Sequence, residues 1–139
     1  MGRLLAVDYG TKRIGLAISD PSGEFVSPAG TIDGRGGAGK DAEQIIAWAT
    51  KNEIAGIVVG LPYNMDGSIG PQARMSTALA RELQRRVSLP VETWDERLSS
   101  FQADQWMAEA GVPNSQQAGL RDTLAAVAIL KSFLQSKKS

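Results

Sequence analysis

Hydrophobic residues follow two spacings along the chain, and these spacings divide it into strands and helices. Short apolar runs bounded by Gly, Pro, Asp or Ser predict strands, whereas apolar residues three or four positions apart predict helices. The expected strands are 4–9, 13–19, 24–32, 54–62 and 90–95. The expected helices are 41–52, 71–86, 99–110 and 118–135, and residues 136–139 are expected to form a frayed polar tail.

The order of these elements predicts an α/β fold with a mixed sheet. The first two strands are joined by a tight turn that begins at Gly10, so they should form an antiparallel hairpin. The strand at 54–62 is continuously apolar, as is typical of a buried parallel strand. Pro28 marks the third strand as an edge strand or an irregular strand. At 139 residues, the chain is expected to form a single domain over 1–139.

Composition narrows the chemistry that the chain can perform. The sequence has no Cys and no His, which excludes disulfides and thiolate zinc sites and removes the commonest general base. Lys plus Arg and Asp plus Glu both number 15, so a non-specific nucleic-acid coat is disfavoured, although a local basic cleft is not. No apolar run approaches the roughly 20 residues that span a bilayer. We therefore expect a cytoplasmic protein without membrane partners.

Carboxylates stand where a hydrophobic core is expected. Asp8 lies inside the first apolar strand, where an ionised carboxylate is costly unless something pairs with it. Asp95 and Glu96 end the last strand, and Asp122 lies near the start of the last helix. If these groups meet, their repulsion raises their pKa values, and Mg²⁺ or Mn²⁺ relieves it. Two such ions about 4 Å apart support phosphodiester hydrolysis.

Each carboxylate also has a simpler interpretation. Acids at strand ends are usually turn or cap residues, and an acid in the first turn of a helix, such as Asp122, is favoured by the helix dipole. Asp95 and Glu96 could belong to a solvated charged turn. Tyr9 and the tryptophans are expected to pack in the core rather than to stack on bases.

Four motifs occur in a fixed order: DYGTKRIGLA from Asp8, VGLPYNMDGS from Val59, DERLSS from Asp95 and DTLAAVAIL from Asp122. Together they resemble the YqgF family (RuvX-like), Holliday-junction-resolvase-like proteins also described as pre-16S rRNA nucleases. The resemblance covers residues 4–134. It implies an RNase H-like fold, in which a five-stranded mixed sheet flanked by helices carries catalytic acids at its centre.

The resemblance also implies roles for individual acids. Asp8 matches the catalytic aspartate of the first strand, and Asp122 matches that of the last helix. For the catalytic acid at the end of the last strand, the resemblance gives Glu96 as first choice and Asp95 as second. Only one of the two can face the site if the strand stays extended. Asp8, Glu96 and Asp122 would hold one or two Mg²⁺ or Mn²⁺ ions for in-line hydrolysis that leaves a 5′-phosphate and a 3′-hydroxyl. Arg121 stands where many members have an aliphatic residue preceded by Lys.

Cationic residues in the same motifs are candidates for nucleic-acid contacts. Those expected beside the acids are Lys12, Arg13 and Arg97. Arg74 is expected to contact the nucleic-acid strand further from the acids. Each could instead be a solvated surface charge.

The implied activity is processing of the 5′ end of pre-16S rRNA, with nucleic acid and ribosome-assembly proteins as partners. One alternative is a Holliday-junction resolvase, which needs two sites on a four-way DNA junction and hence a homodimer, whereas end processing needs only a monomer. Another is an rRNA-binding assembly factor that does not cut. The first hairpin also resembles the phosphate-binding hairpin of sugar kinases and actin-like ATPases, but those need two such domains.

Overall fold

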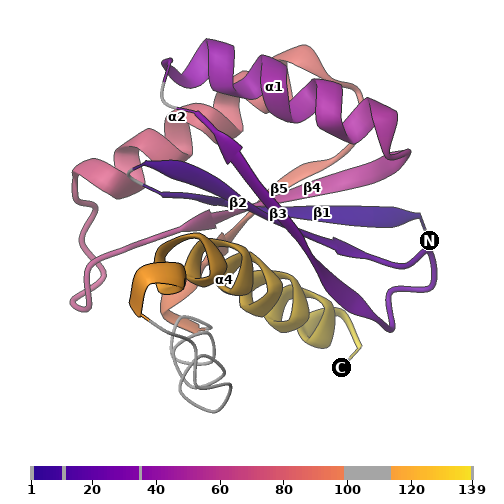
Figure 1. The fold of residues 1–139 in the computed structure, drawn as a ribbon. Helices are drawn as coiled ribbons and strands as arrows, with labels where there is room; N and C mark the ends of the chain where they lie inside the picture. The colour runs from indigo at the N-terminus through magenta and orange to yellow at the C-terminus, as the bar shows by residue number, and fades with distance from the viewer. Residues whose placement is uncertain (1, 11, 35, 99–113, 139) are drawn as a thin grey trace.

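The computed structural model describes residues 2–10, 12–34, 36–98 and 114–138, and its centre is a five-stranded mixed sheet (Figure 1). The strand order is β3-β2-β1-β4-β5, so β1 is central, as predicted. β1 and β2 are antiparallel, as are β2 and β3, whereas β4 runs parallel to β1 and β5 parallel to β4. The strands are β1 Arg3–Tyr9, β2 Arg13–Ser19, β3 Val26–Asp33, β4 Ile54–Leu61 and β5 Val91–Asp95.

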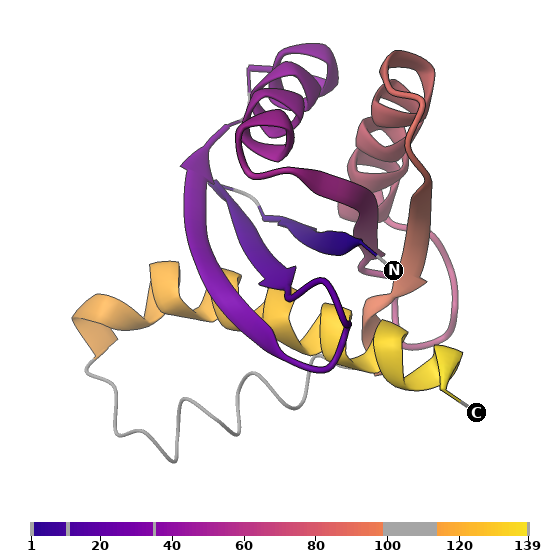
Figure 2. The same cartoon turned by 90° about the vertical axis from the view of Figure 1, so that its right-hand side faces the viewer.

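Helices cover both faces of the sheet. The α-helices are α1 Ala38–Lys51, α2 Pro71–Arg86 and α4 Asn114–Lys137, and a 3₁₀ turn, η1 Glu96–Leu98, follows β5. Figure 2 shows α1 and α2 side by side on one face and α4 across the other. The described helices include none that is long and apolar enough to cross a membrane.

Alternation along β1 assigns its side chains to the two faces. Leu5, Val7 and Tyr9 belong to the core beneath α1 and α2, and Ala6 belongs to the core beneath α4. Because successive side chains of a strand point to opposite faces, Asp8 lies on the same face as Ala6, facing α4.

The core beneath α4 combines small residues on the sheet with large ones on the helix. Ala6 and Ala17 are fully buried, and their small side chains let the helix come close to the strands. The rings of Trp94 and Phe133 meet edge to face at 5.7 Å, and the Trp94 indole donates a hydrogen bond to Ser132 Oγ at 3.0 Å. Trp94 is therefore a packing group, as predicted.

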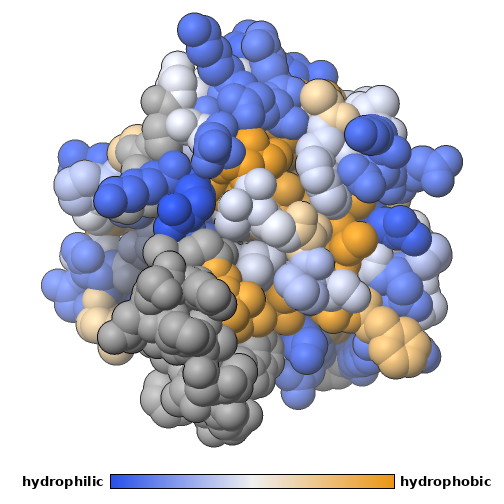
Figure 3. Space-filling model, in the orientation of Figure 1, coloured by the Kyte–Doolittle hydropathy of each residue, from blue (hydrophilic) through white to orange (hydrophobic). Residues whose placement is uncertain are grey.

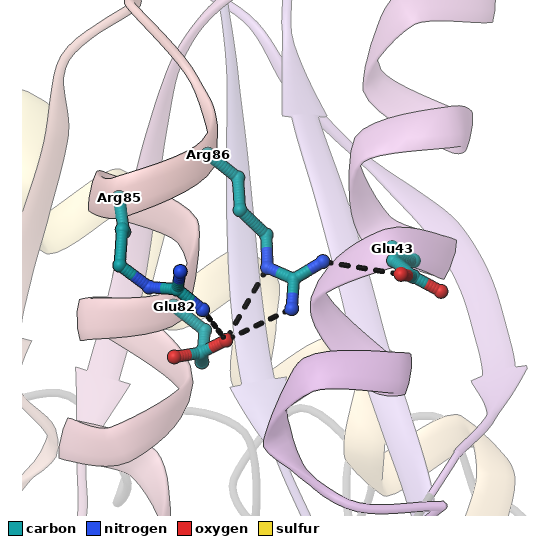
Figure 4. A network of polar contacts seen from close by, with 4 residues as sticks. All are labelled: Glu43, Glu82, Arg85 and Arg86. Atoms are coloured by element: carbon teal, nitrogen blue, oxygen red, sulfur yellow. Dashed lines mark hydrogen bonds and ion pairs between the residues drawn. The ribbon is translucent and has the colours of Figure 1, made fainter.

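Ion pairs link the two helices of the opposite face (Figure 4). Arg86 of α2 lies 3.0 Å from Glu82 of the same helix and 3.1 Å from Glu43 of α1. These side chains are partly exposed, so salt screens the interaction and its contribution is small. The apolar contacts of Ile45, Leu79 and Leu83 in the same core contribute more to holding the layer together.

β3 is an edge strand, as its proline predicted. Ser27, Pro28 and Thr31 are exposed along it. In Figure 3 a band of nearly neutral surface runs across this edge, with hydrophobic surface on both sides of it. A proline cannot donate a hydrogen bond to an added strand, so it protects an open sheet edge.

Two helices differ from their predicted bounds, and a third predicted helix lies outside the described residues. α1 begins at Ala38 rather than at Asp41, and Asp41 is not its cap: this residue is buried and accepts a hydrogen bond from the Tyr9 hydroxyl. The predicted tail at 136–139 is wrong in part, because α4 continues through Lys137. The predicted helix at 99–110 lies outside the described residues.

Candidate active site

Asp8 stands between two glycines on the face of the sheet that α4 covers. Its antiparallel partner on β2 is Gly15. On its other side, the register that pairs Val7 with Val59 puts Gly60 of β4 next to Asp8. Because neither neighbour has a Cβ atom, other groups can approach the Asp8 carboxyl from both sides.

The space above Gly60 is filled by the side chain of Glu96. A Cβ atom built on Gly60 would lie 2.9 Å from both Cγ and Oε2 of Glu96. β5 ends at Asp95, and the chain then turns into η1, so Glu96 leaves the line of the strand. Its carboxyl group passes over β4 to the carboxyl group of Asp8, with which it can share a hydrogen bond when one of the two acids is protonated. Gly60 therefore lets an acid that follows β5 reach β1, although β4 lies between the two strands.

Burial and neighbouring carboxylates shift the pKa values of both acids. Burial raises the pKa of Asp8 well above its usual range, and the charges of Glu96 and Asp122 raise it further. Burial also raises the pKa of Glu96 to about 6, against the opposing effect of its hydrogen bond with Asp8. The two carboxyl groups therefore favour sharing a proton, and a cation could take the place of that proton.

Asp122 is held beside this pair by the close contact of α4 with β2. A Cβ atom on Gly15 would lie 2.1 Å from the Asp122 carbonyl oxygen, so the helix backbone rests directly on the strand there. The next residue, Thr123, donates a hydrogen bond to the Leu16 carbonyl oxygen at 2.7 Å. The Asp122 carboxylate accepts a hydrogen bond from Arg13 Nε at 3.1 Å. Asp122 thus lies near Asp8 but engages Arg13.

Asp95 engages Arg97 instead of the acid pair. Arg97 Nη2 lies 2.7 Å from Asp95 Oδ2, and Arg97 Nε also contacts both carboxylate oxygens. This hydrogen bonding lowers the pKa of Asp95. Of the two predicted candidates, Glu96 is therefore the acid that the structure brings to Asp8.

The four predicted phosphate-binding cations have two kinds of surroundings. Arg13 and Arg97 each form an ion pair with a predicted site acid. Lys12 and Arg74 are exposed, the latter in the first turn of α2. All four remain predictions as nucleic-acid contacts.

Two of the three acids that were predicted to bind metal, Asp8 and Glu96, lie together. Within the described residues, no three acids form a metal-binding group: Asp8 and Glu96 converge, whereas Asp122 is turned to Arg13. In the described part of the chain, the expected compact cluster of three carboxylates is therefore not formed. The donor set still fits Mg²⁺ or Mn²⁺, because these ions prefer oxygen ligands and the two converging carboxyl groups need charge compensation.

Sequence analysis did not predict the roles of Gly15, Gly60 and Thr123. The first two are buried glycines inside apolar strands, a pattern that marks close approach of another part of the chain. That pattern could have identified them, although not what approaches. The sequence carries no comparable signal for the hydrogen bond from Thr123.

Acids gathered over the central strand of a mixed five-stranded sheet, with a helix across that face, define an RNase H-like α/β fold. A solved structure, Thermus thermophilus RuvC in complex with Holliday junction substrate, matches with a TM-score of 0.60 over 100% of this chain and 98% of that one. Its sequence identity is 11%, so the match concerns the fold alone. The family model RuvX, described as Holliday junction resolvase, matches residues 2–136. The chain belongs to this family.

Curated relatives cover nearly the whole chain. A protein of Pelotomaculum thermopropionicum named "Putative pre-16S rRNA nuclease" is 38% identical over 97% of this chain and 88% of its own length. A protein of Rhodobacter capsulatus with the same name is 41% identical over 96% of this chain and 84% of its own length. The same name is carried by a Lachnospira eligens protein that is 38% identical over 98% of this chain and 99% of its own length.

Proposed function

We propose that this protein is a metal-dependent nuclease that hydrolyses phosphodiester bonds at the 5′ end of pre-16S rRNA in the cytoplasm, with residues 1–139 acting as one nuclease domain. The observation that carries the proposal is the position of the Glu96 side chain over Gly60, which brings its carboxyl group to Asp8 of the central strand. The name of the curated relatives supports the choice of substrate.

The proposal gives each predicted site residue a role. Asp8, Glu96 and Asp122 would hold Mg²⁺ or Mn²⁺, and a bound ion would supply charge neutralisation at the scissile phosphate and an activated water. Arg13 orients Asp122, with which it is paired at 3.1 Å. Asp95 holds Arg97 beside the acids, where this cation contacts phosphate.

Two further cations extend the proposed contact surface. Lys12 follows the first strand and is exposed, so it can meet a phosphate close to the acids. Arg74, in the first turn of α2, contacts the nucleic-acid strand further from the acids. Ribosome-assembly proteins would add affinity that a chain of zero net charge does not supply by itself.

The family description favours a second candidate function. A Holliday junction resolvase would cut a four-way DNA junction as a homodimer, because two strands must be cut at symmetric positions. A monomer suffices for trimming one RNA end. Light scattering of the purified protein with and without a junction distinguishes these two assemblies.

A cleavage assay in Mn²⁺, Mg²⁺ and EDTA tests the proposal. The substrates are a pre-16S 5′ segment, an unrelated single-stranded RNA and a four-way DNA junction. We expect cutting of the precursor in either metal and none in EDTA, with 5′-phosphate products. Preferential cutting of the junction would establish the resolvase instead. RNA binding without cutting in any metal would identify an assembly factor that does not cut.

Replacing Gly60 by Ala is expected to reduce cleavage while the protein stays folded. The new Cβ atom would meet Glu96 Cγ and Oε2 at 2.9 Å and Ile129 Cδ1 at 2.5 Å. These are mobile parts of side chains, so they can move aside, but Glu96 then leaves Asp8. We expect a roughly 10- to 100-fold lower cleavage rate and a loss of stability of about 1–3 kcal/mol. Single-turnover rates and thermal melts measure both, and an unchanged rate would contradict the role of Gly60.

A further inference from the structure

Three large hydrophobic side chains are exposed on the segments that follow β4 and β5. Among the described residues, the exposed large hydrophobic residues are Phe25, Met65, Ile69 and Leu98. Phe25 lies beyond the far end of β2, whereas the other three belong to the segments that follow β4 and β5. These are the segments that lead away from the edge of the sheet where Glu96 meets Asp8. Met65 is 89% exposed, the largest value among these four side chains.

The turn that carries Met65 is held by its own hydrogen bonds. The Asn64 backbone N–H donates to the Ser68 carbonyl oxygen at 3.0 Å, and the Gly67 N–H donates to the Asn64 carbonyl oxygen at 2.8 Å. Asp66 Oδ1 accepts a further bond from the Ser68 N–H at 2.9 Å. Gly67 has a φ of 88°, which suits glycine. The turn therefore presents Met65 to solvent in a defined position.

Arg97 joins this turn to the acid pair. Its guanidinium lies 5.7 Å from the centre of the Tyr63 ring, within the range of a cation–π contact. Its Nη1 atom is 3.5 Å from the Met65 carbonyl oxygen, and its Nη2 atom is 2.7 Å from Asp95 Oδ2. Arg97 directly follows Glu96, so its guanidinium lies close to the proposed cutting site. The Tyr63 ring and the exposed Met65 thioether belong to the turn that Arg97 contacts.

We propose that Tyr63, Met65 and Arg97 form a binding surface for unpaired nucleotides next to the scissile phosphate, so that the enzyme acts on a single strand. The bases of a single strand expose their faces and stack on aromatic rings and guanidinium groups. The bases of a duplex are stacked on one another and cannot do so. Arg97 also provides the positive charge that the adjoining phosphate needs. This inference rests on the proposed nuclease function and specifies its substrate class.

Fluorescence anisotropy in EDTA tests the surface without cleavage. The probes are a labelled single-stranded RNA of about 15 nucleotides, a DNA strand of the same sequence, and the corresponding RNA duplex. Tyr63→Ala and Met65→Ser are the test variants. Phe25→Ser is the matched control, because it removes an exposed hydrophobic side chain at the far end of the sheet. Tyr63→Phe keeps the ring, and Met65→Ser changes a solvent-exposed side chain that the fold does not need.

We expect each test variant to bind both single strands about tenfold more weakly than the wild type, with duplex binding changed by less than about twofold. Phe25→Ser and Tyr63→Phe should bind as the wild type does. The inference is overturned if the wild type prefers the duplex, or if both test variants bind single strands normally. If the variants bind single strands normally and still cleave, the binding surface is wrong and the nuclease function stands. If the wild type binds single strands through this surface but does not cleave, the nuclease function is wrong and the binding surface stands.

Discussion

Asp8→Asn is expected to abolish metal-dependent cleavage while making the metal-free protein more stable. The amide cannot serve as an anionic ligand, so we expect the cleavage rate to fall roughly a thousandfold or more. In the folded protein, burial and two neighbouring acids raise the pKa of Asp8, so ionising it opposes folding. Asn removes that cost and can still donate a hydrogen bond to Glu96. We expect a gain of about 1–3 kcal/mol at neutral pH in EDTA, measured by chemical denaturation.

Asp20→Asn is the matched control for this prediction. Asp20 lies in the turn after β2, at the other end of the sheet, where hydrogen bonds from Ser22 and from the backbone of Phe25 and Glu24 lower its pKa. Its ionised form supports the fold, so Asn should lower stability and leave cleavage unchanged. Cleavage by Asp8→Asn at the wild-type rate would remove Asp8 from the active site. Lower stability of Asp8→Asn in EDTA would contradict the electrostatic account of the pair.

Gly15→Ala is expected to lower the stability of the protein more than Gly60→Ala or Gly56→Ala. The added Cβ atom would lie 2.1 Å from the carbonyl oxygen and 2.4 Å from the carbonyl carbon of Asp122. Both atoms belong to the backbone of α4, so no side-chain rotation relieves the clash and the helix must move. We expect a loss of about 3 kcal/mol or more in the free energy of unfolding. Cleavage should fall as well, because Asp122 moves with the helix.

Gly56→Ala provides the comparison for Gly15→Ala. It adds the same methyl group to β4, on the other side of β1 from β2, where the nearest atom is Leu4 Cδ2 at 2.9 Å. That atom ends a flexible side chain, so we expect a change within about 1 kcal/mol. Urea denaturation of both variants under the same conditions decides the point. Equal losses would show that α4 does not depend on close contact with Gly15.

Local patterns in the sequence were sufficient to predict most of the fold. All five strands were predicted within two residues of their observed ends, because strand periodicity and turn residues act over a few neighbours. The start of α1 was missed because Asp41 looks like a cap, whereas it is buried and accepts a hydrogen bond from Tyr9, a residue far away in the sequence. A pattern confined to neighbouring residues cannot reveal such a partner.

The sequence by itself determined the strands, a central first strand with an acid in it, and an all-oxygen set of candidate ligands. The tertiary structure decided which acids meet. Glu96 reaches Asp8 because β5 ends at Asp95 and Gly60 leaves space over β4. Asp122 lies nearby because α4 rests on Gly15, yet its carboxylate engages Arg13. These outcomes depend on contacts between distant segments, and such contacts exist only once the sheet and its helices have packed.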